Sequence, residues 1–441
     1  MASPGAAGPE AAGPGAARRG APGRGAGSQD EVRRHNLGAL LRLLHERGAT
    51  SRSDLVAHTG LNRSTVGALT TQLAEAGLVR ECAPVGRGAA GRPSIVVEPC
   101  PPTYALAVEI GVDGLSAARV GLGGDVLQRC ELRQDPGSRS PATTVARVRD
   151  LVDELLDGAD RTAVCVGLGV AVAGLVRACD GTVRLAPNLR WDDVPLARLL
   201  HEELGVGVPV RVGNEADLGA RAEHVRGAGV GVADMIYLSG EVGLGGGIIL
   251  GGQPLTGAGG YAGEVGHMLV NPRGRACRCG RTGCWETEIG EDAVLVATRS
   301  APGATLADVF AAHAAGHRPT RLGLENVGRW LGVGVANLVN LLNPELIVFG
   351  GLTRDLFPAV EPVVRESLAS ALLAPRAHVR LELPGLGGDS NLIGAAELAF
   401  APLLDDPLGV LAEAARRPVP ERRRPRRGRP TAVAPGRVAG G

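Results

Sequence analysis

The sequence predicts a two-part α/β protein, in which a small helical unit with one hairpin precedes a larger layered domain. In the first part, apolar residues recur at helical spacing between polar turn residues. In the second part, short apolar strands alternate with amphipathic helices from residue 103 to residue 400, a pattern typical of α/β layers. The length of 441 residues allows two or three domains.

Composition restricts the class of protein. Apolar residues make up 44% of the chain but aromatic residues only 2%, so Val, Leu and Ala must form most of the core. The formal net charge is only +1, so the overall charge of the chain does not point to any class of partner. A nucleic-acid site must therefore lie in a limited part of the chain. Because we recognise neither a secretory signal nor a membrane-spanning run, we expect a cytoplasmic protein with reduced cysteines and no membrane contact.

Both ends of the chain are of low complexity. Residues 1–29 are rich in Ala, Gly and Pro, and residues 404–441 form an Arg/Pro-rich tail. We expect both segments to be disordered, because they offer too few apolar side chains to offset the entropy of ordering. The basic tail is either simply solvated or attracts nucleic acid without sequence preference.

Residues 30–98 carry the signals of a winged helix-turn-helix. Leucines at helical spacing predict a first helix that Gly48 ends, and the Ser51 to Asp54 stretch resembles a capping box that opens a second. Asn62 can cap a third helix over residues 63–76. Two strands, at residues 78–80 and 94–97, then enclose a Gly-rich loop. The leucines of the first helix are Leu37, Leu40, Leu41 and Leu44.

The third helix presents short polar groups and an arginine on its outer face, as a helix that reads DNA does. We therefore expect operator DNA as a partner, with contacts from the start of this helix and from two arginines of the wing. A protein-binding three-helix module is the alternative. The expected contact residues are Arg63, Ser64, Thr65, Arg87 and Arg92.

The segment from residue 103 to residue 400 is expected to form one larger domain. Its predicted strands lie at residues 105–110, 115–122, 163–172, 235–238, 246–250 and 346–349. Its predicted helices lie near residues 143–156, 195–204, 215–226 and 323–341.

A short loop rich in Gly and Pro brings together one imidazole and three thiols. The residues are His267, Cys277, Cys279 and Cys284. Four nitrogen and sulfur ligands are what tetrahedral Zn²⁺ needs, and a Cys₃His set without an open position is typical of a structural site. The sequence therefore predicts bound zinc, with three unrelated thiols beside a surface histidine as the alternative.

Four stretches together resemble the ROK family of repressors and sugar kinases, and within it the xylose-repressor-like branch. They are Asn-Glu-Ala-Asp at residues 214–217, Gly-Leu-Gly-Gly-Gly-Ile-Ile-Leu-Gly-Gly at 243–252, Gly-Glu-Val-Gly-His at 263–267 and Asn-Pro-Glu-Leu-Ile-Val-Phe-Gly-Gly at 343–351. The resemblance implies an actin-like (ribonuclease H-like) fold of two lobes with a sugar in the cleft between them.

The resemblance also implies which residues hold the sugar. These are Asn214, Glu215, Glu264, His267 and Glu286, to which Asn188 can add a contact. Carboxylates suit this role because they accept pairs of vicinal hydroxyl groups in charge-assisted hydrogen bonds. His267 can offer one ring nitrogen to zinc and the other to a hydroxyl, and the metal then fixes its tautomer.

The chain departs from the kinases of that family at the phosphate loop. Where a kinase has Asp-x-Gly-Gly-Thr, this chain has a Val112 side chain in place of the second glycine and Asp113 in place of the threonine. Val112 adds a Cβ where the backbone should approach phosphate, and Asp113 places an anion there. Glu215 replaces the catalytic aspartate, which displaces the general base. We therefore expect no catalytic residues and no ATP-dependent phosphorylation.

These observations predict a sugar-responsive DNA-binding regulator, a repressor of carbohydrate genes that acts as a homodimer or higher oligomer on near-palindromic operators. Two rival hypotheses stay open. The first is a ROK-type sugar kinase with an attached DNA-binding domain. The second is a regulator whose sensory domain binds another protein.

Overall fold

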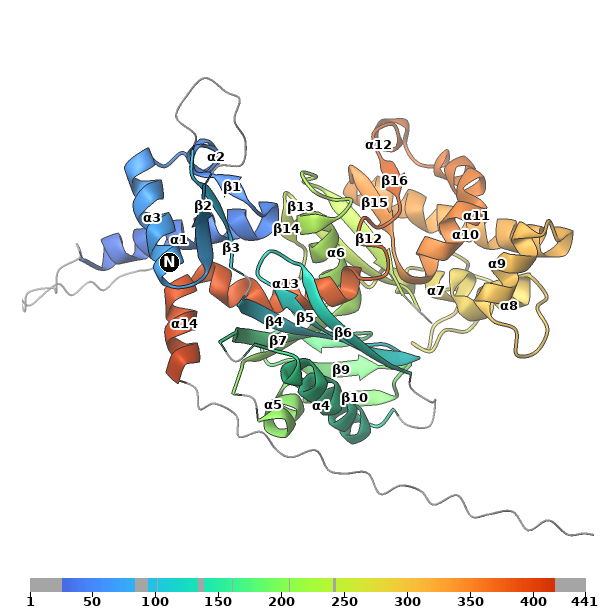
Figure 1. Cartoon of the computed structure of the whole chain (residues 1–441). Coiled ribbons are helices and arrows are strands. Elements are labelled where there is room, and N and C mark those ends of the chain that lie inside the picture. Colours follow the sequence, from blue (N-terminus) through green and yellow to red (C-terminus); the bar gives the residue numbers. More distant parts are fainter. Residues whose placement is uncertain are drawn as a thin grey trace, which may run out of the picture.

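The structure is a computed structural model, and its description covers residues 26–83, 94–100, 102–133, 139–160, 162–205, 207–240 and 243–416. Figure 1 shows a small N-terminal unit beside two larger lobes. Among the described residues, the strands form two five-stranded and two three-stranded sheets. No helix of this part of the chain has the length and apolarity needed to cross a lipid bilayer.

The N-terminal unit consists of three helices and a small sheet. The helices are α1 (Ala26–Arg47), α2 (Arg52–Thr59) and α3 (Arg63–Glu75), and the sheet has the order β1 (Thr50–Ser51), β3 (Val96–Pro99), β2 (Val79–Cys82). Ser51 accepts the Asp54 N–H, and Asn62 accepts the Thr65 N–H at 2.8 Å. Both predicted caps are therefore confirmed. The predicted wing residues Arg87 and Arg92 lie outside the described residues.

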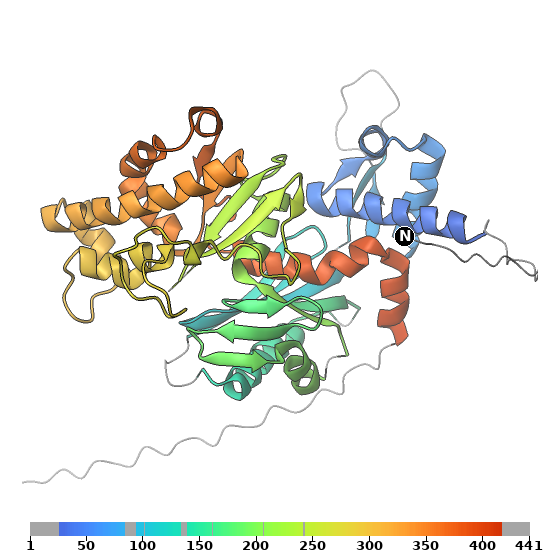
Figure 2. The same ribbon diagram turned by 180° about the vertical axis from the view of Figure 1, so that it is seen from behind.

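The core of this unit is continuous with that of the first lobe. The predicted leucines of α1 are buried against Val66, Leu69 and Leu73 of α3, and the same cluster extends to α13 (Ser390–Asp405). The helices approach closely, since a Cβ added at Gly38 would lie 2.5 Å from the Leu404 carbonyl oxygen. Helix α1 lies beside α13 in both views (Figures 1 and 2).

The first lobe is built on a mixed sheet of order β11-β7-β4-β5-β6. Leu106 and Val108 of β4 pack with apolar residues of α4 and α5, whereas Ala105 and Ala107 belong to the cluster that includes α13. Two helices therefore cover one face of the sheet and α13 covers the other. The elements are β4 (Thr103–Ile110), β5 (Gly114–Gly121), β6 (Val126–Arg133), α4 (Pro141–Asp157), β7 (Val164–Val172), α5 (Leu196–Leu204) and β11 (Val210–Asn214), and a small sheet is formed by β8 (Leu175–Arg177), β9 (Thr182–Ala186) and β10 (Trp191–Val194).

The second lobe has a sheet of order β14-β13-β12-β15-β16. Its core packs Ile236 and Phe349 against Val335 of α10 and Val360 of α11. The elements are α6 (Glu215–Arg226), β12 (Met235–Ser239), β13 (Gly245–Leu250), β14 (Gln253–Pro254), η1 (Val265–His267), α7 (Trp285–Ile289), α8 (Glu291–Ala297), α9 (Leu306–Ala314), α10 (Arg318–Leu342), β15 (Leu346–Phe349), α11 (Gly351–Leu368), α12 (Leu373–Arg376) and β16 (Arg380–Glu382). The predicted α/β architecture and each predicted strand and helix of residues 103–400 are confirmed.

Two predicted boundaries of disorder are wrong. The tail was expected to begin at residue 404, but α13 continues to Asp405 and α14 (Pro407–Arg416) follows it. The physical reason is tertiary: Leu403 and Leu404 are buried, and Leu408, Val410 and Leu411 of α14 pack against the same cluster as α1. At the other end, α1 begins at Ala26, so residues 26–29 are helical. Residues 1–25 and 417–441 lie outside the described residues.

Candidate functional site

One cleft is lined by all six residues that the sequence analysis assigned to a sugar. Its cavity volume is about 110 Å³, and it is bordered by both lobes, through β11 on one side and β13 on the other. The six residues come from separate elements: Asn188 follows β9, Asn214 ends β11, Glu215 begins α6, Glu264 precedes η1, His267 ends η1, and Glu286 lies on α7. Residues far apart in the sequence therefore meet at one place.

Asn214 holds the start of α6. Its Oδ1 accepts the backbone N–H groups of Ala216 at 2.8 Å and Asp217 at 3.2 Å, and its Nδ2 donates to the Gly174 carbonyl at 2.9 Å. The side chain caps the helix and at the same time fixes the adjacent, buried Glu215. An amide nitrogen carries two hydrogens, so the second hydrogen of Nδ2 can still serve a ligand in the cleft.

His267 lies between two carboxylates. Its Nε2 is 4.0 Å from Glu264 Oε2, and its Nδ1 is 3.5 Å from Glu286 Oε1. Burial raises the pKa of Glu264, His267 opposes that rise, and the Glu286 carboxylate adds to it. The cleft thus combines acceptors for hydroxyl hydrogens with a ring nitrogen, a set suited to a polyhydroxylated ligand.

Sequence reasoning missed Asp217, the last residue of the Asn-Glu-Ala-Asp stretch. Burial, together with the neighbouring Glu264 carboxylate, raises the pKa of Asp217 to about 7. The i,i+3 spacing from Asn214 at a helix start was a signal that could have placed it on the same face. Its electrostatic contact with residue 264 could not be read from local sequence.

The four expected metal ligands converge. The ligand atoms of His267, Cys277, Cys279 and Cys284 all lie within 4.8 Å of one another. The loop is held by its own backbone: Cys277 N–H donates to the Arg281 carbonyl at 2.7 Å, and Gly283 has a φ of 78°. A Cβ added at Gly283 would lie 1.7 Å from the Asn271 carbonyl oxygen, so only glycine fits this turn.

The thiolate is the form that ligates a metal, and the pKa values of the three thiols differ in direction: burial raises the pKa of Cys284, and the pKa of only Cys279 is lowered. The Arg281 backbone N–H is the main group that lowers the pKa of Cys279 to about 6. Burial and the Glu286 carboxylate instead raise the pKa of Cys277, whose Sγ lies 2.9 Å from Glu286 Oε1. His267 Nδ1 is 3.7 Å from Cys277 Sγ. The imidazole therefore turns Nδ1 to the thiols and Nε2 to Glu264, so that one ring joins the cluster to the cleft.

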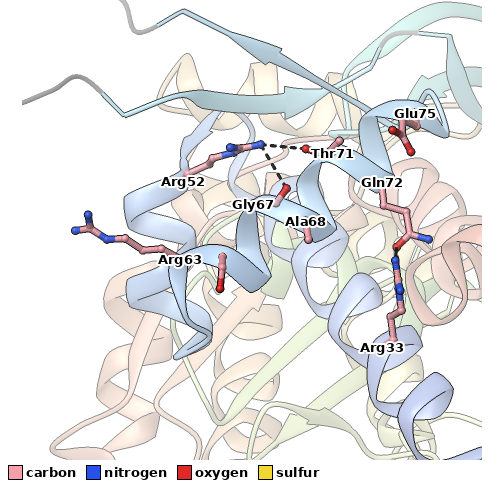
Figure 3. A pocket seen from close by; sticks show the side chains of 9 residues that line it. Arg33, Arg52, Arg63, Gly67, Ala68, Thr71, Gln72 and Glu75 are labelled. Carbon is pink, nitrogen blue, oxygen red and sulfur yellow. Dashed lines mark hydrogen bonds between the residues drawn. The ribbon is translucent and has the colours of Figure 1, made fainter. Parts of the chain in front are cut away.

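The outer face of α3 borders a polar groove (Figure 3). Arg63 is exposed and makes no hydrogen bond or ion pair within the described part of the chain. Ser64 is exposed, with its Oγ donating to Asn62 Oδ1 at 2.7 Å, and Thr65 is half-buried. The groove is lined by Arg33, Arg52, Arg63, Ser64, Gly67, Ala68, Thr71, Gln72 and Glu75.

Two further arginines flank α3, and sequence reasoning missed both. Arg33 of α1 donates from Nε and Nη2 to Gln72 Oε1 at 3.0 and 2.8 Å. Arg52 of α2 lies over Thr71 and pairs with Glu81. They belong to other helices, so the periodicity of α3 carries no sign of them.

The model of the ROK family matches residues 105–401. The chain belongs to the ROK family. The predicted resemblance is therefore confirmed, and it covers both lobes.

Relatives of two kinds are similar to this ROK protein. It is 28% identical to the xylose repressor of Caldicellulosiruptor bescii, over 86% of this chain and 99% of that protein. It is 30% identical to the glucokinase of Streptomyces coelicolor, over 67% of this chain and 98% of that enzyme. The crystal structure of a ROK family transcriptional regulator, a homologue of the E. coli MLC protein, matches with a TM-score of 0.72 and 26% identity, over 87% of this chain and 99% of the other.

Residues 109–114, where the sequence analysis compared the chain with the kinase phosphate loop, border two clefts. Val112 is buried and lines the cleft that holds the six predicted sugar-binding residues. Glu109 Oε1 accepts from Asn391 Nδ2 at 2.9 Å across a second cleft that these two residues border. Asp113 is not among the residues that line this second cleft. Its side chain is 87% exposed and pairs with Arg139 at 3.3 Å, which corrects the expectation that it faces the phosphates.

Proposed function

We propose that this ROK-family chain is a sugar-responsive transcriptional repressor of carbohydrate genes. Residues 30–98 act as a winged helix-turn-helix on operator DNA, and residues 103–400 bind the sugar effector. The observation that carries the proposal is the convergence of six polar side chains on one cleft. In the same chain, α3 borders a polar groove that includes the unpaired Arg63. The similarity to a xylose repressor along 86% of the chain supports it.

The cleft would bind a pyranose through its hydroxyl groups. Glu264 and Glu286 accept hydroxyl hydrogens, Glu215 accepts from the buried side, and Asn188 and Asn214 add amide contacts. Such charge-assisted hydrogen bonds contribute roughly 1.5–3 kcal/mol each. Recognition of this kind needs no reaction at the sugar.

We further propose that the Cys₃His cluster holds a structural Zn²⁺. Three thiols and His267 Nδ1 supply the number and the types of ligand that a structural, tetrahedral zinc site would need. When bound, the metal would fix the tautomer of His267, so that Nε2 carries the proton and donates to a ligand hydroxyl or to Glu264. Loss of the metal would therefore also weaken the sugar site.

The similarity to glucokinases favours a second candidate function, ATP-dependent sugar phosphorylation. Two residues argue against this activity: Val112 adds a Cβ at the position of the second glycine of the kinase phosphate loop, and Glu215 displaces the base by one methylene. A coupled assay with ATP and a panel of hexoses, pentoses and N-acetyl sugars separates the two functions. Turnover on the order of 1 s⁻¹, as in kinases, would favour the enzyme.

The proposal is tested on the zinc-loaded full chain by thermal shift with a panel of monosaccharides and their phosphates. A ligand that binds the native state raises the melting temperature by mass action.

We also propose a homodimer that binds a near-palindromic operator, because the symmetry of a dimer maps onto two half-sites. Sedimentation of the free and the DNA-bound chain measures that assembly.

A further inference from the structure

A buried polar network joins the N-terminal unit to the two lobes. His45 of α1 is 0% exposed, and its Nε2 lies 3.1 Å from both carboxylate oxygens of Glu397 on α13. The Gly123 N–H donates to His45 Nδ1 at 3.0 Å. The same Nε2 lies 2.7 Å from Arg226 Nη2, so the His45 ring contacts both Glu397 and Arg226. A histidine placed in this way fixes α1 in position and in rotation.

Arg226, the last residue of α6, completes the network. Its Nε donates to Glu397 Oε1 at 2.7 Å, and its Nη1 donates to the Gly123 carbonyl at 2.6 Å. The guanidinium lies so close to the β5–β6 turn that a Cβ added at Gly124 would come within 2.4 Å of Arg226 Cζ. Despite burial, His45 and Arg226 lower the pKa of Glu397, so the carboxylate stays charged. Helices α1, α6 and α13 and the β5–β6 turn therefore meet at the buried carboxylate of Glu397.

Helices α6 and α13 form a rigid pair. The fully buried carboxylate of Glu223, on α6, accepts from the Gly385 and Leu386 backbone N–H groups at 2.8 and 3.0 Å. It also accepts from Ser390 Oγ, at the start of α13, at 2.7 Å. The two backbones touch, since a Cβ added at Gly394 would lie 2.0 Å from the Leu218 carbonyl oxygen. A shift of α6 must therefore move α13 with it.

The two ends of α6 lie at the two places that a regulator has to connect. Its first turn carries Glu215 and is capped by Asn214, both in the sugar cleft. Its last residue is Arg226, in the network with α1. Twelve helical residues span about 18 Å, so a displacement at the sugar reaches α1 through a single helix. Helix α13 packs against α6, and α1 lies beside α13 (Figures 1 and 2).

We infer that His45, Arg226 and Glu397 are positioning residues that couple sugar binding to the placement of the DNA-binding helices. This inference rests on the proposed function. A sugar that binds Glu215 changes the preferred position of α6. The buried network then moves α1 with α6, and α3 follows because α1 and α3 share one core. Coupling of this kind changes the spacing of two winged units only while the network is intact.

The coupling is measured as the ratio of operator dissociation constants with and without saturating sugar. The probes are D-xylose, D-glucose and N-acetyl-D-glucosamine, and the operator is a duplex selected from a random pool by the full chain. In Arg226→Gln we expect this ratio to fall at least tenfold toward 1, while the affinity for sugar of the DNA-free protein stays within threefold. The reciprocal effect of operator on sugar affinity must fall by the same factor. Arg365→Gln, which removes an exposed arginine paired with Glu361 on α11, is the control and should keep the ratio.

A second variant guards against loss of the fold. Arg226→Lys keeps a positive charge beside Glu397 but cannot reach both Glu397 and the Gly123 carbonyl, so an intermediate ratio is expected. Only variants that melt at a temperature close to that of the wild type and hold the same amount of zinc are folded and are compared. An unchanged ratio in folded Arg226→Lys and Arg226→Gln would overturn the inference.

A sugar-free readout separates this inference from the proposed function. Hydrogen exchange of the α1 amides should be faster in both Arg226 variants than in the wild type and the Arg365→Gln control. If no sugar changes operator binding by the wild type, the proposed function fails, and the exchange rates alone decide whether the network positions α1. Equal α1 exchange in all four proteins would contradict the positioning role.

Discussion

At the scale of single residues, the proposed sugar cleft holds two carboxylates, Glu264 and Glu286, on either side of the His267 imidazole. Glu264→Gln or Glu286→Gln should weaken sugar binding by roughly 1.5–3 kcal/mol, because each removes a charge-assisted acceptor. Operator binding without sugar should not change, since α3 belongs to a separate part of the chain. Calorimetry with the sugar and a titration with operator measure the two effects. Unchanged sugar affinity in both variants would remove these carboxylates from the site.

Asp217 makes the stability of the fold depend on pH. Its pKa is raised from 3.8 to about 7 by burial and by Glu264, so between these values the folded chain holds a proton that the unfolded chain has lost. Stability therefore falls as pH rises through this window, by at most about 1.4 kcal/mol per pH unit. Asp217→Asn should be more stable than the wild type at pH 8 and nearly equal to it at pH 4.

Urea unfolding at the two pH values checks this expectation. Asp192→Asn, which removes an exposed carboxylate, serves as the control. A gain in stability for Asp217→Asn that is the same at both pH values would show that packing, and not the proton, is responsible.

At the scale of elements, the metal loop and helix α3 have separate expected roles, and each can be tested alone. Cys279→Ser should lose stoichiometric zinc and loosen residues 264–286, because metal affinity is here part of the local folding energy. Elemental analysis and limited proteolysis measure both effects. Cys179→Ser, at an exposed cysteine outside the cluster, should keep the metal. Retention of one zinc per chain by Cys279→Ser would reject the ligand assignment.

Helix α3 is expected to read the operator through its first turn. Arg63→Ala should reduce the discrimination between operator and scrambled duplex by roughly 1–3 kcal/mol if the guanidinium makes a bidentate contact with a base. Arg198→Ala, on α5 of the first lobe, is the matched control. A salt titration on both duplexes distinguishes base contact from phosphate contact. Equal affinity of Arg63→Ala and the wild type on both duplexes would favour the protein-binding alternative for residues 30–98.

The elements that could be predicted are those whose signals are local. Asn62 and Ser51 cap their helices through hydrogen bonds to residues three positions away, so sequence spacing was sufficient. Helix α14 was missed because its apolar residues are ordered only by contact with distant helices. The same holds for the side chains of the site. The Cys cluster spans a short loop, whereas His45, Arg226 and Glu397 meet only in the folded chain.

At the scale of the whole molecule, the fold places two different surfaces on one continuous body. The N-terminal unit shares its core with α13, and α13 is fixed to α6, which begins in the sugar cleft. A protein arranged in this way can report occupancy of the cleft at α3 without any chemical change in the ligand. Differential affinity of the sugar for two lobe arrangements is the physical requirement.

The most direct test is an operator titration of the zinc-loaded full chain, with and without a sugar that raises its melting temperature. A repressor released by sugar requires that this sugar weakens operator binding, by about 5- to 150-fold for a typical coupling free energy, and that Glu264→Gln abolishes the effect at the same sugar concentration. Operator affinity that is identical with and without every sugar that binds would contradict sugar-responsive repression.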